Sequence, residues 1–281
     1  MSRVTVVTDS TASLPDGAAE ELGIVVVPLQ VVIGATSYDE GVATSDMVAD
    51  ALREFTPVST SRPTPAAMAD VYEAAVADGA EEIVSIHLSR DMSGTFDSAE
   101  VAARDASVPV LAVDTRQVGF GTGYAVLAAA AVARDGGTAA EVAAAARARA
   151  EATTSLFYVE TLEYLRRGGR VGAAAALLGS ALAVKPLLTL TDGKVASLEK
   201  VRTAGKALAR LEDLAVEAAG SGPAEITVAH LASPERAEQL AAKLTGRVEL
   251  ASPVRIAELG AVLGAHVGPG MVSVCVAPAL D

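Results

Sequence analysis

Ser93, Gly94 and Thr95 stand where an apolar run at residues 83–88 is followed by an amphipathic segment. A strand that ends in such a turn at a helix N-terminus directs hydroxyls and unpaired backbone N–H groups at one point, which is a way to hold an anion without a cation. The tip of this loop has no Lys, no His and no Gly-x-Ser-x-Gly sequence, so Ser93 is not equipped as an esterase nucleophile. We expect the turn to hold an anionic group. The alternative, that Ser93 only caps the helix, stays open at this point.

Two further segments have residue types suited to an anion. Residues 60–65 read Thr-Ser-Arg-Pro-Thr-Pro and precede a helical pattern, where a plain Ser/Thr-Pro helix cap is the structural alternative. Arg166, Arg167 and Arg170 surround a Gly-Gly pair in an acidic chain and suit a phosphate or an acidic partner. An arginine-rich helix end stopped by glycine explains the second segment equally well.

The three histidines differ in their surroundings. Glycines and a proline flank His266, so we expect it on an irregular loop where its imidazole can reach a ligand; an ordinary loop histidine is the alternative. His87 and His230 lie inside strand-like runs and are expected in the core or at a sheet edge. No His, Cys or carboxylate pair has metal-ligand spacing, so no metal site and no cofactor is expected.

Two weaker patterns lie near expected strand ends. Residues 119–123, Gly-Phe-Gly-Thr-Gly, resemble half of a dinucleotide-binding fingerprint but lack its final spacing and its downstream acid. Asp9, Ser10 and Thr11 follow the first expected strand, where they either add polar groups to the site or cap a helix.

Composition excludes several classes of function. A net charge of -13 over 281 residues opposes nucleic-acid binding and anionic membranes. The N-terminus lacks the long apolar stretch of a signal peptide, and no apolar run is long enough to span a bilayer. Cys275 is the only cysteine and lies in an apolar run, which predicts a buried thiol and a reducing, cytoplasmic location.

Alternation of β-branched runs with Ala-rich segments predicts an α/β/α layered first domain with a mainly parallel sheet. The predicted strands of this domain are residues 4–8, 24–33, 83–88 and 108–113. Its predicted helices are residues 14–22, 46–55, 66–77, 95–104, 124–134 and 139–152. Further along, Asp192-Gly193 between two apolar runs predicts a β-hairpin, so the second domain has a mixed or antiparallel sheet. Its other expected strands are residues 156–159, 225–231, 248–256 and 271–276, and its expected helices are residues 204–219 and 234–244. We expect domain boundaries at residues 1–154 and 155–281.

Several of these segments, in this order along the chain, together resemble the DegV family of bacterial fatty-acid-binding proteins. The segments are Asp9-Ser10-Thr11, residues 60–64, residues 93–99, residues 164–170 and residues 266–270. The resemblance implies a two-domain α/β protein that encloses one long-chain fatty acid in an apolar tunnel between its domains and performs no chemistry itself. It also implies a partner, an ATP-dependent fatty acid kinase, to which the carboxylate is presented for acyl phosphate formation and phospholipid synthesis. Residues 173–182 suit the lining of such a tunnel, and a core helix explains them equally.

The resemblance also implies roles for individual residues. The residues implied to bind the fatty-acid carboxylate are Thr60, Ser61, Ser93, Gly94, Thr95 and His266. Those implied to contact the kinase or the phosphate are Arg166, Arg167 and Arg170. Arg62 departs from the family, which commonly has Gln there. If Arg62 faces the pocket, it adds a fixed positive charge beside the head group; if it faces outward, nothing changes.

Two other functions remain open at this point. Ser93 with His266 as its base would make a phosphotransferase or hydrolase for a small anionic substrate. A regulatory module that senses lipid and binds a partner through residues 166–170 would share the site of the carrier.

Overall fold

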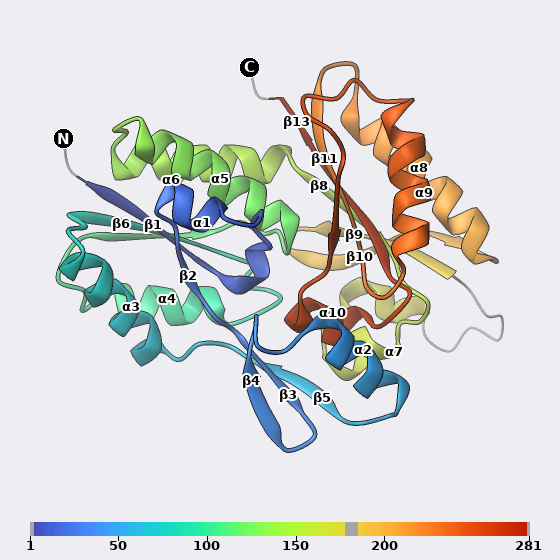
Figure 1. Ribbon diagram of the computed structural model, residues 1–281, viewed down its shortest axis with the longest axis horizontal. Helices are drawn as coiled ribbons and strands as arrows, with labels where there is room; N and C mark the ends of the chain where they lie inside the picture. Colours follow the sequence, from blue (N-terminus) through green and yellow to red (C-terminus); the bar gives the residue numbers. More distant parts are fainter. Residues whose placement is uncertain (1–2, 178–184, 280–281) are drawn as a thin grey trace. The chain divides into compact units, whose positions relative to one another are not determined.

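The computed structural model describes residues 3–177 and 185–279 (Figure 1). Its contacts divide the chain into two compact units. Unit 1 comprises Met1–Gln30 and Ser61–Glu151, and unit 2 comprises Val31–Thr60 and Ala152–Asp281. The apolar segment at residues 173–182 lies outside the described residues from position 178 onward.

Unit 1 is built on a four-stranded parallel sheet. Its strands, in spatial order, are β2 (Val25–Val27), β1 (Val4–Asp9), β6 (Glu82–His87) and β7 (Val110–Asp114). Side chains of a strand point alternately to opposite faces, so Val6 and Val7 enter different apolar clusters. Helices cover both faces of the sheet, which makes three layers (Figure 1).

The helices of unit 1 fall into two groups by face. The first group comprises α1 (Ala18–Leu22), α5 (Phe120–Arg134) and α6 (Ala139–Ala152), and the second comprises α3 (Pro65–Ala77) and α4 (Thr95–Ala103). A short 3-10 helix, η1 (Ser10–Ala12), follows β1. A Cβ placed on Gly123 of α5 would overlap the carbonyl oxygen of Ala12. The glycine-rich run at residues 119–123 therefore includes a glycine that close packing of α5 on η1 requires.

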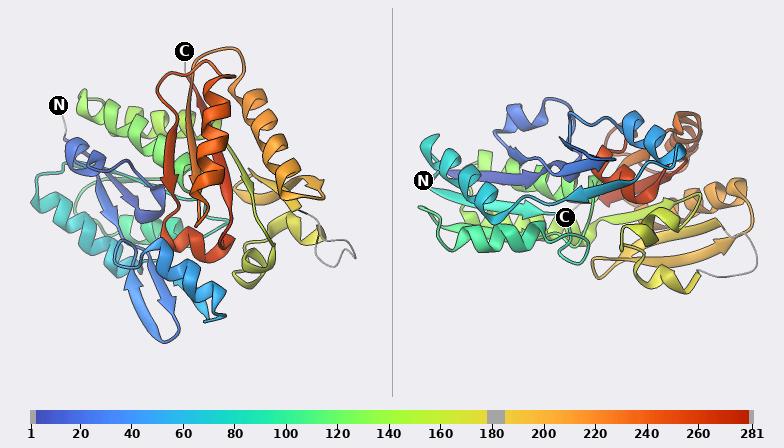
Figure 2. Two further views of the ribbon diagram at one scale, coloured as in Figure 1. Left: turned by 45° about the vertical axis from the view of Figure 1, so that its right-hand side comes forward. Right: turned by 90° about the horizontal axis from the view of Figure 1, so that it is seen from below.

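Unit 2 contains a six-stranded mixed sheet. Its strands, in spatial order, are β10 (Lys194–Val201), β9 (Lys185–Thr191), β8 (Thr154–Tyr158), β13 (Val272–Pro278), β11 (Ala224–His230) and β12 (Arg255–Glu258). Every neighbouring pair is antiparallel except β11 with β12. The helices α8 (Ala204–Ala219) and α9 (Pro234–Thr245) bury their apolar faces on this sheet (Figure 2).

Smaller elements complete unit 2. They are the three-stranded sheet of β4 (Thr36–Asp39), β3 (Gln30–Ile33) and β5 (Val58–Ser61), the helices α2 (Ser45–Arg53), α7 (Glu163–Arg167) and α10 (Ala261–Val267), and the 3-10 helix η2 (Gly172–Leu177). Hydrogen bonds tie residues 31–60 to the C-terminal part of the chain, among them the two that follow. Ser45 Oγ donates to Leu259 O at 2.7 Å, and Val262 N donates to Glu40 Oε1 at 2.9 Å.

The predicted fold class is confirmed: a parallel sheet in the first unit and a mixed sheet in the second. The predicted hairpin is also present, because β9 and β10 pair through Asp192 and Gly193, whose φ angles of 51° and 76° suit a tight hairpin turn. Cys275 is buried as predicted.

The expected strand at residues 24–33 is wrong in detail. It forms two strands in separate sheets, with Pro28 and Leu29 between them. Proline lacks the N–H that a sheet ladder needs, so the run is interrupted there. Residues 31–60 group with unit 2, whereas the expected boundary placed them in the first domain. The expected strand at residues 248–256 is also wrong in detail, since β12 begins only at Arg255.

Candidate functional site

The turn at Ser93-Gly94-Thr95 connects β6 to α4 in unit 1. The N-cap of α4 is Gly94, which has no side chain to cap the helix, so Ser93 precedes the cap position. Ser93 Oγ lies 2.9 Å from Thr95 Oγ1 and accepts a hydrogen bond from Thr95 N at 3.4 Å. The first N–H groups of a helix have no partner within the helix. The turn therefore combines two hydroxyls with the N-terminus of α4.

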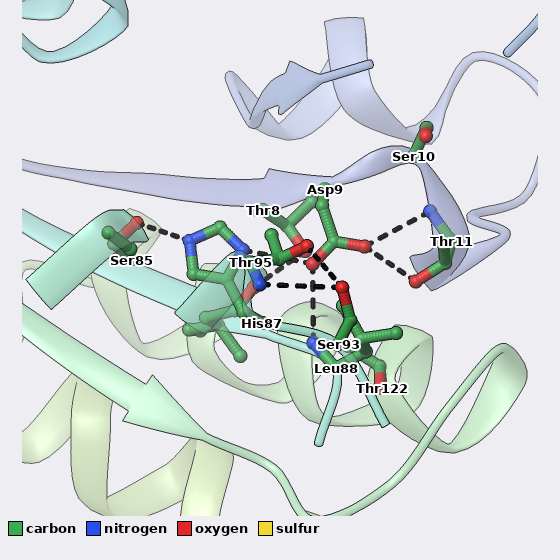
Figure 3. A network of polar contacts seen from close by, with 12 residues as sticks. Thr8, Asp9, Ser10, Thr11, Ser85, His87, Leu88, Ser93, Thr95 and Thr122 are labelled. Atoms are coloured by element: carbon green, nitrogen blue, oxygen red, sulfur yellow. Dashed lines mark hydrogen bonds and ion pairs between the residues drawn. The ribbon is translucent and has the colours of Figure 1, made fainter. Parts of the chain in front are cut away.

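A buried carboxylate lies close to this turn (Figure 3). Asp9 ends β1 and is fully buried. Its Oδ1 accepts hydrogen bonds from Thr11 N at 3.1 Å and from Thr11 Oγ1 at 2.5 Å. Its Oδ2 accepts from His87 Nδ1 at 2.9 Å and from Leu88 N at 3.2 Å. Asp9 thus fixes η1 and the start of the loop from β6 to α4.

The network continues on the other side of the imidazole. His87 Nε2 lies 2.7 Å from Ser85 Oγ, and Tyr72 Oη donates to Ser85 Oγ at 2.8 Å. With Nδ1–H donated to the carboxylate, Nε2 accepts the hydroxyl proton of Ser85. Burial raises the pKa of Tyr72 to about 12, so Tyr72 keeps the proton that it donates. Ser85 is fully buried, so its hydroxyl is not accessible to solvent, and the Ser-His-Asp arrangement joins β6 to β1.

The residues of the segment 60–65 make different contacts and have different structural roles. Thr64 is the N-cap of α3, and its Oγ1 accepts from Ala67 N at 3.1 Å, so the capping interpretation holds for this residue. Ser61 is exposed, and its Oγ donates to Gln30 Oε1 at 3.3 Å. Arg62 is exposed as a whole, but its guanidinium lies over Gly94 in the turn described above.

Thr60 and His266 meet in unit 2, where Thr60 Oγ1 lies 2.9 Å from His266 Nε2. The expectation that His266 lies on an irregular loop is wrong, because it occupies the last turn of α10. Residues 261–267 contain no proline, and the helix ends only at Gly268, whose φ of 75° favours glycine. Burial, followed by the positive charge of Arg170, lowers the pKa of His266 to about 4, so the imidazole is neutral at pH 7.

The second ring nitrogen of His266 is also buried. Nδ1 has no hydrogen-bond partner within residues 3–177 and 185–279. A Cβ placed on Gly168 would overlap Nδ1, so the glycine after α7 gives the imidazole its space. Gly168 thus admits the His266 ring, while Gly169, with a φ of 73°, follows α7 in the left-handed region that favours glycine.

Arg166, Arg167 and Arg170, around the pair Gly168-Gly169, each form hydrogen bonds to residues nearby in the sequence. Arg166 Nε and Nη2 donate to the two carboxylate oxygens of Glu163 at 2.9 and 2.7 Å, and Arg167 Nε donates to Oε1 at 2.7 Å. These contacts lower the pKa of Glu163 to about 2. Arg170 Nη1 donates to Gly168 O. Arg166 and Arg167 are exposed, so their guanidiniums face solvent while sharing one carboxylate.

The structure therefore gathers the predicted residues into two groups. Ser61, Arg62, Ser93, Gly94 and Thr95 belong to unit 1, and Thr60, Arg166, Arg167, Arg170 and His266 belong to unit 2.

Sequence reasoning missed the hydrogen bond between His87 and Asp9. His87 was expected in the core or at a sheet edge, and it is indeed fully buried, but its partner was not anticipated. A signal was present, because Asp9 and His87 each end an apolar strand. The carboxyl ends of adjacent parallel strands meet at one sheet edge, which brings two such residues together.

The described part of the chain contains neither a metal-binding cluster nor a membrane-spanning helix. No group of three or more His, Cys, Asp or Glu side chains there is arranged to hold a metal ion. No helix within the same residues has the length and apolar character needed to cross a membrane.

Comparison with known proteins shows that the chain belongs to the DegV family. The family model, described as "Uncharacterised protein, DegV family", matches residues 3–279. A DegV domain-containing protein of Streptomyces coelicolor is 53% identical over 278 residues, which is 98% of this chain and 99% of the relative.

Solved structures of DegV proteins share the fold. A DegV family protein from Thermus thermophilus, described as fatty acid binding, has a TM-score of 0.92 and 32% identity over 98% of this chain and 99% of that chain. DegV from Bacillus subtilis, described as a fatty acid binding protein, has a TM-score of 0.88 and 29% identity over 99% of both chains.

The depressed pKa of His266 predicts a pH-dependent stability. Between pH 6.5, its ordinary pKa, and about 4, the unfolded chain binds a proton that the folded chain does not, so folding weakens as the pH falls. From pH 7 to 4.5 this contribution is about 2 kcal/mol. Urea unfolding of the wild type and of His266→Gln at both pH values measures it. We expect the variant to lose about 2 kcal/mol less than the wild type on acidification; equal losses would contradict the assignment.

Proposed function

We propose that this protein binds one long-chain fatty acid, holds its carboxylate at the Ser93-Gly94-Thr95 turn, and presents that carboxylate to a partner kinase for acyl phosphate formation. The observation that carries this proposal is the turn itself, where two hydroxyls meet the N-terminus of α4. DegV proteins described as fatty acid binding share the fold with this chain at 32% and 29% identity. A cytoplasmic location and a role in phospholipid synthesis belong to the same proposal.

The energetics separate the roles of tail and head group. A tail of a dozen or more methylenes, at roughly 0.8 kcal/mol per buried CH₂, supplies on the order of 10 kcal/mol before the cost of association. Each hydrogen bond to a charged head group adds roughly 1.5–3 kcal/mol. The tail therefore supplies most of the affinity, and the hydroxyls decide which end of the ligand is displayed.

The site favours a carrier over an enzyme. Within the described residues, Ser93 Oγ is hydrogen-bonded to Thr95 alone, and neither residue is a base. The hydroxyl bonded to His266 is that of Thr60. A nucleophile needs a base within hydrogen-bond reach. Ser93 has none within unit 1, which supports a protein that holds its ligand without transforming it.

The remaining head-group contacts are proposed from both groups of residues. In unit 1, Ser61 is exposed and bears a hydroxyl. In unit 2, the neutral imidazole of His266 and the hydroxyl of Thr60 form a polar pair that can donate to a carboxylate. Testing variants of the two groups against the same fatty acid shows which of them contact it.

The kinase contact is proposed at Arg166, Arg167 and Arg170. Glu163 forms ion pairs with Arg166 and Arg167 and so neutralises part of their positive charge, but both guanidiniums are exposed. Exposed arginines in a chain of net charge -13 offer a local basic spot for an acidic partner or a phosphate.

Ser93→Ala should weaken fatty-acid binding by about ten- to a hundredfold, because one hydrogen bond to a charged group is lost. Displacement of a fluorescent fatty acid by palmitate measures the affinity, and thermal unfolding monitored by circular dichroism reports the fold. Ser107→Ala is the matched control, since Ser107 is exposed and bonds only Glu73 in unit 1. Unchanged binding by Ser93→Ala would make Ser93 a structural residue, and a wild type that binds no fatty acid would overturn the proposed function.

Arg166→Glu combined with Arg167→Glu should abolish most ATP-dependent acyl phosphate formation by a fatty acid kinase while leaving fatty-acid affinity unchanged, because the double change reverses the local charge. Trapping the acyl phosphate with hydroxylamine measures product. Arg104→Glu combined with Arg147→Glu changes the same charge at exposed arginines of unit 1 and serves as the control. Equal product from both double variants would contradict the proposed contact.

A further inference from the structure

The helix that carries His266 is weak by its own sequence. α10 has seven residues, whereas an isolated helix needs about 12–15 residues to be marginally stable in water. Gly264 lies inside α10, and only proline is a poorer helix former than glycine. The N-cap is Gly260, which has no side chain to cap the helix. Contacts from other elements must therefore hold α10 in place.

Residues 31–60 provide such contacts at the start of α10. Ser45 Oγ donates to Leu259 O at 2.7 Å, just before the helix. Glu40 Oε1 accepts from Val262 N at 2.9 Å, in the first turn of the helix. The helix α2, which belongs to the same segment, lies beside α10 (Figure 1). A segment more than 200 residues away in the sequence thus fixes the N-terminal turn of α10.

Glu40 takes the place of the missing helix cap. A side-chain oxygen that accepts from an N–H of the first turn satisfies a donor that has no partner within the helix. A Cβ placed on Gly260 would lie 2.5 Å from Glu40 Oε1. The φ and ψ of Gly260 are -59° and 159°, which other residues adopt without strain. Glycine at the N-cap therefore makes room for the carboxylate, and the backbone does not require it.

The position of α10 decides the surroundings of His266. The imidazole lies in the last turn, where Nε2 is 2.9 Å from Thr60 Oγ1 and Gly168 leaves room for Nδ1. Burial, followed by the charge of Arg170, lowers the pKa of His266 to about 4. Thr60, Gly168 and Arg170 all lie outside α10. The burial and the contacts of the ring therefore depend on how α10 is held.

We propose that Glu40 is a positioning residue for His266, because by capping α10 it holds the imidazole beside Thr60, where the head group of the ligand meets it. The inference rests on the proposed function, since it takes His266 as a contact of the fatty-acid head group. Glu40 acts through the helix, so its loss should change both the titration of His266 and the affinity for the ligand.

Titration of His266 in the full chain, followed by NMR, tests this role. Glu40→Ala should raise the pKa of His266 from about 4 toward its ordinary value of 6.5, because a loosened α10 admits water to the ring. Loss of a negative charge would by itself lower the pKa of a histidine, so a rise identifies a loss of position. Glu40→Gln keeps an acceptor oxygen and should titrate close to the wild type. The spectrum of His266→Gln identifies the His266 signal among the three histidines.

Gly260→Ala reaches the same cap without removing a charge. Its methyl group would displace the Glu40 carboxylate, so it should reproduce the higher pKa of His266. Both Glu40→Ala and Gly260→Ala should weaken palmitate binding by about fivefold, the effect of one lost helix cap. Thermal unfolding monitored by circular dichroism reports whether each variant is folded.

Glu54→Ala is the matched control for the charge. Glu54 is an exposed carboxylate of the same segment, and its side chain makes no hydrogen bond or ion pair with any residue that the structure describes. This variant should change neither the pKa of His266 nor the affinity for palmitate.

Two results would overturn the positioning role. One is an unchanged pKa of His266 in the folded Glu40→Ala and Gly260→Ala proteins, and the other is a Glu40→Gln protein that titrates like Glu40→Ala. A wild type that binds no palmitate would instead overturn the proposed function, and the titration would still decide whether Glu40 positions His266.

Discussion

Asp9, buried at the carboxyl edge of the parallel sheet, accepts hydrogen bonds from Thr11 N, Thr11 Oγ1, His87 Nδ1 and Leu88 N. A buried carboxylate is costly unless such donors surround it, and here each oxygen receives two. The candidate site of unit 1 depends on this arrangement, because the same bonds fix the ends of β1 and β6 and the start of the loop that carries Ser93 (Figure 3). The backbone that carries Ser93 is thereby held before any ligand arrives.

The two groups of proposed site residues differ in the kinds of polar side chain that they contain. The group in unit 1 combines hydroxyls, the N-terminus of α4 and the guanidinium of Arg62. The group in unit 2 offers a neutral imidazole, kept neutral by its burial and by Arg170, together with the hydroxyl of Thr60.

Sequence patterns predicted the features that depend on local rules. Alternating β-branched and Ala-rich runs indicated the parallel sheet, and Asp192-Gly193 indicated the hairpin. Sequence patterns could not predict that residues 31–60 group with unit 2, because this grouping depends on long-range contacts such as the hydrogen bond between Ser45 and Leu259. His266 was placed on a loop because its flanking glycines masked a short helix. The position of Arg62 over Gly94 is a matter of side-chain conformation, on which spacing gives no information.

Native mass spectrometry of the purified chain tests the central claim most directly. If the protein binds one long-chain fatty acid, the native mass should exceed the 28.3 kDa chain by the mass of a single acyl chain, and denaturation should release that mass. A chain that shows no added mass, and gains none after incubation with palmitate, would contradict the account.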